Sequence, residues 1–576
     1  MSGTTRTADE LTLSPAADAP DLPAAPAPPG SPPGTAPPDS PPEAAPAARH
    51  AQPGDPVVER PGALAALARH ADHLVLGALT LVVTLVHTIG VLDFPTLADD
   101  EGTYTAQADA VRVGELAHYT YWYDHPPLGW IQLGALDWIP RTLLDVQPVA
   151  ATRLVMVLAA SLAAALTYLI ARRTGFGRSC AALATLLAFC SPLAVTVQRQ
   201  VYLDNIAAPW VLLSLWLALD PRRRLWQQVA AGAVFAVAVL SKETVLVLLP
   251  VVLWAVVRTA DRRIRPFAVA GAAGAAALGI VAYPLLALLR NELLPGAGHV
   301  SLWDAMVYQT VGRSGSGQLW DRGSAARAVL GSWLYYDPWI IVLGLCGLPV
   351  MLLVPRLRVL GVALLVVVLV GIKPGGYLPA MYIVMALPLL GLSAAGALDQ
   401  ALVLLRRLPP LAPLAPLATA RRAGVLAPVV VGAAAAALVV PWWPGLHDAA
   451  TTRTNDERSQ AEAWLVANVP SRSVLLLDDV SWVAVSDRGV VPRPQAVWFY
   501  KLDTDPAVAK LLPHGWRDVS YLVSTDQMRL SLSGDPGLRQ ARAAMTHSVP
   551  VATFGSGSSA VEVRRVQVDD PAEATP

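Results

Sequence analysis

The amino-acid sequence predicts an all-α polytopic membrane protein with about eleven transmembrane helices, followed by a small extracytoplasmic α/β domain. Three observations lead to this fold class. Of the 576 residues, 54% are hydrophobic and only 15% are charged, whereas about a quarter are charged in an average soluble domain. Apolar segments of membrane-spanning length recur between residues 73 and 443. The composition after residue 443 is again that of a soluble protein.

The first 62 residues are dominated by Pro, Ala, Ser and Gly. They lack the apolar side chains that would offset the entropy of ordering, so we expect a disordered cytoplasmic tail. No apolar region of signal-peptide type precedes the first span, which is therefore expected to direct insertion. The formal net charge of zero does not favour nucleic acid as a partner. The three cysteines lie in apolar runs and suggest core positions rather than a disulfide framework.

The membrane domain is expected over residues 63–443. Its spans are recognised by apolar runs of about the length that a bilayer requires, and they are 73–92, 149–171, 179–197, 204–220, 225–241, 243–258, 266–289, 336–354, 357–372, 377–397 and 424–443.

Lys and Arg in short loops favour the cytoplasm. With a cytoplasmic N-terminus, the basic loops 171–178, 220–224, 258–265, 355–358 and 404–424 all fall inside. The first outer loop, 93–148, and residues 444–576 then lie outside. The segment 126–144 is also apolar, but counting it as a span would reverse this pattern. We expect it to lie at the outer surface or to be partly re-entrant.

The C-terminal segment shows signals of both helix and strand. "NDERSQAEAWLVANV" predicts an amphipathic helix capped by Asn455. "SVLLLDD", "AVWFYKL" and "VSYLVST" predict short buried strands. We expect an α/β domain over 444–576 whose last residues are loose.

Unusual charged groups gather on the predicted outer side. The stretch "LADDEGTYTAQADAV" places three adjacent carboxylates just after the first span. Cations in the short outer turns run against the charge rule of membrane proteins, which makes them more informative than the inner arginines. The outward groups include Asp99, Asp100, Glu101, Tyr123, His125, Arg199, Asp204, Lys242 and Lys373.

These groups have both a chemical and a structural interpretation. Carboxylates at the membrane surface could accept a proton from a hydroxyl, and cations could hold a phosphate that leaves with negative charge. The carboxylates could also cap helices, Lys242 could extend to the interface, and the aromatic residues 119–130 could form an interface belt. A divalent metal could be held, but no ligand spacing is diagnostic, so no metal site is predicted.

Several motifs of the sequence, in this order, resemble the polyprenyl-phosphate-dependent glycosyltransferases of the GT-C class, which include protein O-mannosyltransferases and lipid A aminoarabinose transferases. The resemblance covers roughly residues 70–260, and it rests on "ADDEGTY", "DHPPLGW", "ATRLVMVLAASLAAALTYLIARRTGFG", "QRQVYLDN" and "AGAVFAVAVLSKETVLVLLP".

The resemblance implies a mannosyltransferase-like enzyme of the cell envelope, with a lipid-linked sugar donor and transfer that inverts the anomeric carbon. Protein glycosylation is one such activity, and lipid or polysaccharide acceptors are others. By position, the catalytic base of the family corresponds to Asp100, although Asp99 duplicates the carboxylate and Glu101 adjoins it. Residues expected to bind substrate are Asp204, Arg199, Lys242, His125, Tyr123 and Lys373.

Two other functions compete with this one. A transporter or flippase of lipid-linked sugars would also have many spans and buried ionisable groups. It would place charges near the middle of the membrane and show matching broken helices in two halves, and the sequence shows neither. A scaffold anchored by its spans is the other alternative, but eleven or so spans exceed what an anchor needs.

Overall fold

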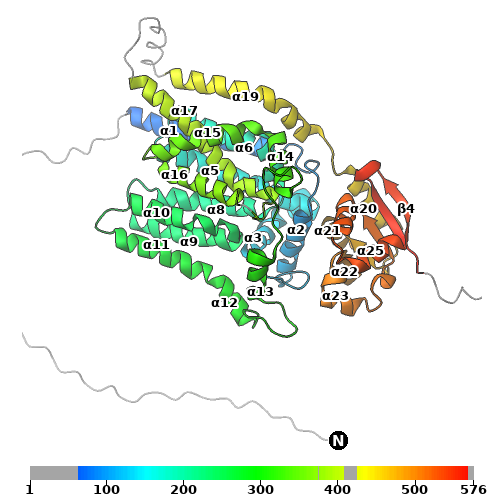
Figure 1. The fold of residues 1–576 in the computed structure, drawn as a ribbon. Helices are drawn as coiled ribbons and strands as arrows, with labels where there is room; N and C mark the ends of the chain where they lie inside the picture. The colour runs from blue at the N-terminus through cyan, green and yellow to red at the C-terminus, as the bar shows by residue number, and fades with distance from the viewer. Residues whose placement is uncertain (1–62, 374, 408–424, 569–576) are drawn as a thin grey trace, which may run out of the picture. The chain divides into compact units, whose positions relative to one another are not determined.

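The computed structural model describes residues 63–373, 375–407 and 425–568 (Figure 1). The predicted disordered tail, residues 1–62, lies outside the described residues. The described residues up to 451 are built from helices, and a smaller domain with a five-stranded sheet follows. This confirms the predicted fold class of a helical membrane protein with a C-terminal α/β domain.

Every predicted span coincides with a helix or a pair of consecutive helices. These are α1 (Ala63–Thr88), α5 (Pro148–Arg173), α6 (Arg178–Cys190) with α7 (Pro192–Arg199), α8 (Leu203–Ala218), α9 (Leu225–Ser241), η1 (Glu243–Leu248) with α10 (Leu249–Thr259), α11 (Arg265–Ile280) with α12 (Ala282–Leu289), α15 (Pro338–Leu353), α16 (Arg358–Gly371), η3 (Ala380–Tyr382) with α17 (Ile383–Arg407), and α19 (Leu426–Thr451).

Not all of these helices are long enough to cross a bilayer alone. Among the described residues, five helices meet the length and composition of a span, and seven do so if each of two bent pairs counts as one. α8, α9 and α16 are apolar but shorter, at 16, 17 and 14 residues. The number of eleven spans therefore stays a prediction.

The remaining helices before residue 426 lie in the predicted outer loops. The segment 126–144 forms two short helices that meet at Asp137, and neither has the length of a span. These outer elements are α2 (Asp99–Arg112), α3 (Leu128–Leu136), α4 (Trp138–Leu144), α13 (Leu302–Val307), η2 (Tyr308–Gly312) and α14 (Ala325–Tyr336).

Small residues allow the membrane helices to pack closely. A Cβ added at Gly232 of α9 would lie 1.9 Å from the carbonyl oxygen of Ala272 in α11, so only glycine fits there. Close backbone approach through small residues is the usual way in which helices associate in lipid, where water cannot drive their contact. The high alanine and glycine content thus has a direct structural use.

The C-terminal domain has the strand order β2-β1-β3-β5-β4. The first three strands pair in parallel, and β5 joins β3 and β4 antiparallel. The three predicted strands correspond to β1 (Leu475–Leu477), β2 (Ala496–Trp498) and β3 (Tyr521–Ser524), whereas the sequence analysis missed β4 (Ser548–Phe554) and β5 (Val561–Val566). These two strands form a β-ribbon before the last residues, and 569–576, where loose residues were expected, lie outside the described residues.

Short helices connect these strands (Figure 1). They are α20 (Asp456–Asn468), α21 (Asp479–Asp487), α22 (Lys501–Thr504), α23 (Pro506–Leu511), α24 (Asp526–Gly534) and α25 (Arg539–Thr546), with 3-10 turns at Arg493–Gln495, Gly515–Asp518 and Gly557–Ser559. Asn455 precedes α20 as predicted, but its side chain does not cap the helix. Its amide nitrogen instead donates to the carbonyl oxygens of Asp93 and Pro95 at 3.1 and 3.2 Å.

Helix α2 of the first outer loop packs against α21 of the C-terminal domain. Their backbones meet at Gly102, where an added Cβ would lie 2.3 Å from the nitrogen of Val480. α21 begins at the carboxyl end of β1, the central parallel strand. This edge is where open α/β sheets usually bind ligands, and here the chain's own α2 lies against it.

The contact at Gly102 can be tested by adding one methyl group. We expect Gly102→Ala to weaken the docking of the C-terminal domain by about 1–3 kcal/mol, because backbone on both sides prevents relaxation. Faster proteolysis of the full-length protein near residue 452 would report it. Gly77→Ala is the matched control, since a Cβ there meets nothing within 4 Å, and equal proteolysis of both variants would contradict the expectation.

Candidate active site

Helix α2 carries the three candidate carboxylates in its first turn. Acidic groups are favourable there because the helix dipole places partial positive charge at the N-terminus. Glu101 Oε1 also accepts a hydrogen bond from the backbone nitrogen of Ala98 at 3.1 Å. Successive residues of an α-helix project about 100° apart, so the three side chains reach three different surroundings.

Glu101 faces α5 and is fully buried with Arg153. Arg153 Nε and Nη2 donate to the two carboxylate oxygens at 2.7 and 2.8 Å. The backbone nitrogen of Val201 adds a third donor at 3.2 Å. The same guanidinium donates to the carbonyl oxygens of Val91 and Pro95, both at 2.9 Å. Glu101, predicted as part of the acidic centre, thus fixes the first outer loop to the second span.

Asp99 faces the C-terminal domain. Asp479 Oδ2 accepts from the hydroxyls of Thr103 and Tyr500, while the Oδ1 atoms of Asp99 and Asp479 are buried without a hydrogen-bond partner among the described residues. Burial first, and then the charges of Asp479 and Asp478, raise the pKa of Asp99 to about 8. Burial likewise raises the pKa of Asp479 to about 7. Asp99 is therefore protonated over much of the neutral range.

Asp100 faces a different group of charges. Burial raises the pKa of its carboxyl, and the neighbouring cations Lys242 and Arg313 oppose that rise. Within the described residues, the carboxylate makes no hydrogen bond or ion pair. It is therefore available to a ligand, in contrast to Glu101.

Lys242, His125 and Glu243 form a chain of polar contacts beside Asp100. Lys242 Nζ lies 3.0 Å from His125 Nε2, and His125 Nδ1 lies 3.0 Å from Glu243 Oε2. An ammonium group can only donate, so Nε2 must accept and Nδ1 must carry the imidazole proton. This assigns His125 as a neutral imidazole that holds Lys242 in place.

Asp204 completes the cluster from the first turn of α8. Its Oδ2 lies 4.0 Å from Lys242 Nζ and has no hydrogen-bond partner among the described residues. The structure therefore brings together four predicted site residues, Asp100, His125, Asp204 and Lys242. They come from the first outer loop and from the ends of α8 and α9.

Arg199 does not join this cluster, contrary to its expected place in substrate binding. Its buried guanidinium donates to the carbonyl oxygens of Ala449, Val86 and Ile89 at 2.8, 2.7 and 2.5 Å. These contacts tie the end of α1 to α19. We therefore leave Arg199 out of the proposed substrate site.

Tyr123 and Lys373 are not part of this cluster either. The Tyr123 hydroxyl donates to Glu292 Oε2 at 2.5 Å, and its ring is buried. This contact ties the first outer loop to the segment after α12. Lys373 is exposed in the turn after α16. Their predicted substrate contacts stay predictions.

The sequence analysis did not include Arg153, Asp124 or Arg313 among the expected site residues. Arg153 was available as a signal, because a charge inside a spanning helix is costly and demands a partner. Asp124 adjoins His125 among the outward groups of the first loop, whereas Arg313 carries no such local signal. Both residues act on the charge of Asp100. Arg313 lies in the long outer loop before α14 and stacks 3.6 Å over the ring of Tyr377.

Three cavities are lined by residues of the segments that carry the cluster or pack against them. An outer cavity of about 1170 Å³ lies between the first outer loop, α13 and α23, and Asp124 lines it. An apolar groove of about 420 Å³ lies between α3, α5 and α8, and its Gln132 donates to Ser241, beside Lys242, at 2.7 Å. A smaller apolar cavity of about 110 Å³ between α14 and α17 includes Tyr382.

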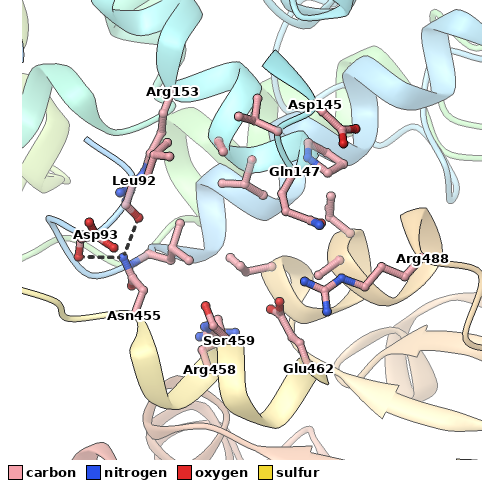
Figure 2. A pocket seen from close by; sticks show the side chains of 18 residues that line it. Leu92, Asp93, Asp145, Gln147, Arg153, Asn455, Arg458, Ser459, Glu462 and Arg488 are labelled. Atoms are coloured by element: carbon pink, nitrogen blue, oxygen red, sulfur yellow. Dashed lines mark hydrogen bonds between the residues drawn. The ribbon is translucent and has the colours of Figure 1, made fainter. Parts of the chain in front are cut away.

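A further cavity of about 330 Å³ lies where α20 and α21 meet the outer loops. Figure 2 shows Glu462 and Arg488 on one side of it and Asp145 and Gln147 on the other. Arg153 also lines this cavity, but its guanidinium is occupied by Glu101. In the part of the chain that the structure describes, no three His, Cys, Asp or Glu side chains are arranged as metal ligands.

Comparison with known proteins supports the predicted resemblance. A family model described as dolichyl-phosphate-mannose-protein mannosyltransferase matches residues 124–286. The comparison with curated proteins gives no match.

Two solved structures of ArnT from Cupriavidus metallidurans have the same fold. The one bound to undecaprenyl phosphate has 18% identity and a TM-score of 0.55, over 87% of this chain and 99% of that one. The apo state has 17% identity and a TM-score of 0.53, over 87% and 98%. An oligosaccharyltransferase from Archaeoglobus fulgidus is more distant, with 13% identity and a TM-score of 0.47 over 84% and 74%.

The burial of Asp99 near Asp479 predicts a pH dependence of stability. Folded Asp99, with a pKa of about 8 against an ordinary 3.8, keeps a proton that the unfolded carboxyl has lost. The free energy of unfolding should therefore fall as pH rises from about 4 to about 8. Asn is neutral throughout, so Asp99→Asn should raise the Tm by a few degrees near pH 8 and flatten its dependence on pH.

Thermal unfolding of the full chain in detergent, measured across the neutral range, checks this expectation. Asp448→Asn is the control, because Asp448 is an exposed acid. If the Tm of Asp99→Asn depended on pH in the same way as the Tm of Asp448→Asn and of the wild type, Asp99 would not be protonated in the folded protein.

Proposed function

We propose that this chain, a polytopic membrane glycosyltransferase of the GT-C class, transfers a sugar from a polyprenyl-phosphate donor to an acceptor hydroxyl at the outer face of the membrane. The observation that carries the proposal is the unpaired carboxylate of Asp100 beside the cations Lys242 and Arg313. The ArnT structure with bound undecaprenyl phosphate supports the class of donor.

Asp100 is the proposed general base. It takes the proton of the acceptor hydroxyl while the oxygen attacks the anomeric carbon. A base works best when its pKa lies near the working pH, and burial moves the pKa of Asp100 upward in that direction. The bond from the anomeric carbon to the phosphate breaks, and its electron pair leaves with the polyprenyl phosphate. One displacement inverts the anomeric centre and needs no second carboxylate as a nucleophile.

Lys242 and Arg313 are the proposed phosphate ligands. Negative charge grows on the phosphate as it leaves, and fixed cations in a water-poor site stabilise that charge strongly. Neutral His125 donates to Glu243 and accepts from Lys242, which fixes the position of the ammonium group. Asp204 balances part of the positive charge before the donor arrives.

The prenyl tail would lie in one of the two apolar cavities that adjoin the cluster. The groove between α3, α5 and α8 is the larger, at about 420 Å³, and is lined by Leu158, Leu162 and Trp210 among others. The route of the tail from the membrane to Lys242 is then short, since Gln132 of this groove contacts Ser241.

The proposed location follows from the charge pattern. We place the N-terminus in the cytoplasm and the C-terminal domain outside, because the basic loops then share one side. The transporter hypothesis gains no support from the comparisons. The charged cluster also lies at the ends of helices, at the first turn of α8 and just after α9, rather than at mid-span.

The base can be tested by removing its charge. Asp100→Asn should bind polyprenyl-phosphate sugar yet lower the rate of transfer by about 10²–10⁴, because the amide cannot accept the proton. Transfer of a labelled sugar by purified full-length protein measures this. Asp99→Asn is the matched neighbour and should keep most of the activity near pH 7. Undiminished transfer by both variants would show that neither aspartate is the base.

The phosphate site can be tested through donor binding. Lys242→Met should weaken the binding of polyprenyl phosphate about tenfold or more, since an ion pair with the phosphate is lost. Fluorescence or calorimetric titration in detergent measures the Kd. Arg539→Met, which removes an exposed cation of the C-terminal domain, should leave it unchanged. Equal Kd values for the Lys242 variant and the wild type would place the phosphate elsewhere.

A further inference from the structure

The outer cavity beside Asp100 is built from three separate parts of the chain. Trp122 and Asp124 come from the first outer loop, Asp304 and Tyr308 from the region of α13, and Lys510 from α23 of the C-terminal domain. Its volume of about 1170 Å³ is at the upper end for small-molecule pockets. A polymer segment fits such a space better than a single small molecule.

The cavity adjoins the proposed site through Asp124, the chain neighbour of His125. Asp124 lines it, is exposed, and lies near enough to Asp100 to raise the pKa of that carboxyl. Gln309, another lining residue, accepts a hydrogen bond from Arg313 at 2.9 Å. One wall of the cavity thus carries Asp124, the chain neighbour of His125, and Gln309, which contacts the proposed phosphate ligand Arg313. An occupant would therefore lie beside the proposed site.

We propose that this cavity is the acceptor cleft and that it takes a neutral oligosaccharide segment of a larger glycan. The proposal rests on the function proposed above and deepens it by naming the class of acceptor. The hydroxyl that Asp100 deprotonates is then a sugar hydroxyl. The new bond joins that oxygen to the anomeric carbon of the donated sugar, and the polyprenyl phosphate leaves.

Two exposed aromatic rings line the cleft. Trp122 is 41% exposed and Tyr308 is 57% exposed, which leaves apolar ring faces in contact with water. An indole or phenol offers an apolar face and a polar tip at the same time, and a pyranose ring has the matching apolar C–H face and polar rim. Lys501 Nζ lies 5.5 Å from the Trp122 ring and holds the indole in place.

The polar groups of the cleft keep unused hydrogen-bonding capacity. Asp304 Oδ2 accepts one bond, from Ser301 Oγ at 2.7 Å, and a carboxylate can accept several. The amide oxygen of Gln309 is taken by Arg313, which leaves its NH2 group to donate. Asp124 makes no hydrogen bond or ion pair within the described residues. A hydroxyl group both donates and accepts hydrogen bonds. Hydrogen-bond donors and acceptors that lie side by side therefore suit the hydroxyl groups of a sugar.

Charge and secondary structure favour a neutral glycan over other acceptors. Asp124 and Asp304 face a single lysine, Lys510, in the lining, so the cleft repels an anionic lipid or a phosphate-rich polymer. No strand contributes to the described lining, so a peptide could not bind by extending a sheet edge. A neutral glycan meets neither obstacle.

The test uses the cells from which this gene comes, with the chromosomal copy replaced by wild type, Asp100→Asn, Trp122→Ala or Tyr308→Ala. Trp320→Ala is the matched control, because Trp320 is a 70% exposed aromatic residue that does not line the cleft. The sugar composition of the polysaccharide, protein and lipid fractions of the envelope is measured in each strain. Donor binding by each purified full-length variant verifies that it folds.

The expected result is loss of one sugar from the polysaccharide fraction in Asp100→Asn. Trp122→Ala and Tyr308→Ala should each lower the same sugar about tenfold, with donor binding unchanged, and Trp320→Ala should match the wild type. Loss from protein or lipid alone would overturn the acceptor class while leaving the proposed function intact.

The remaining outcomes also separate the two proposals. Loss of polysaccharide sugar in Asp100→Asn, with normal levels in both aromatic variants, would overturn the placement of the acceptor in this cleft. No change in any fraction with Asp100→Asn would refute the proposed function itself, and with it the acceptor proposal.

Discussion

The architecture of the site depends on the buried ion pair of Glu101 and Arg153. A guanidinium inside a spanning helix is tolerable only with a partner that satisfies its donors, and Glu101 with the carbonyl oxygens of Val91 and Pro95 satisfies them. The pair fixes the rotation of α2 about its axis. Once Glu101 points at α5, helical geometry directs Asp99 and Asp100 to opposite sides of that contact.

Because the rotation of α2 is fixed, its adjacent residues contact different parts of the protein. Asp99, with Gly102 and Thr103 one turn later, meets the carboxyl edge of the parallel strands in the C-terminal domain. Asp100 meets Lys242 after α9 and Arg313 of the loop before α14. The C-terminal domain is thereby coupled to the proposed base through a single helix, and it also supplies α23 to the proposed acceptor cleft. The position of the C-terminal domain therefore affects both the placement of the proposed base and the shape of the proposed acceptor cleft.

Much of this arrangement could be predicted from the sequence. Apolar length located the helices, and outward charges in short turns identified Lys242 and Asp204, because such charges are costly and need a reason. The parallel strands were visible as short buried runs. The ribbon of β4 and β5 was missed, because β4 is largely exposed and contains Pro550. Arg199 was misplaced, since no local pattern reveals that its donors meet three carbonyl oxygens.

The sequence by itself determined that the chain is a helical membrane protein with a C-terminal α/β domain, and it predicted an outer face on which charge gathers and a short list of groups able to act. Composition, apolar length and charge distribution are local properties, and they need no contacts to be evaluated. Only the tertiary structure decided which of Asp99 and Asp100 faces Lys242 and that Arg313 and Asp124 join them. The physical reason is that a side chain's role follows from its partners, and those partners come from segments up to several hundred residues away.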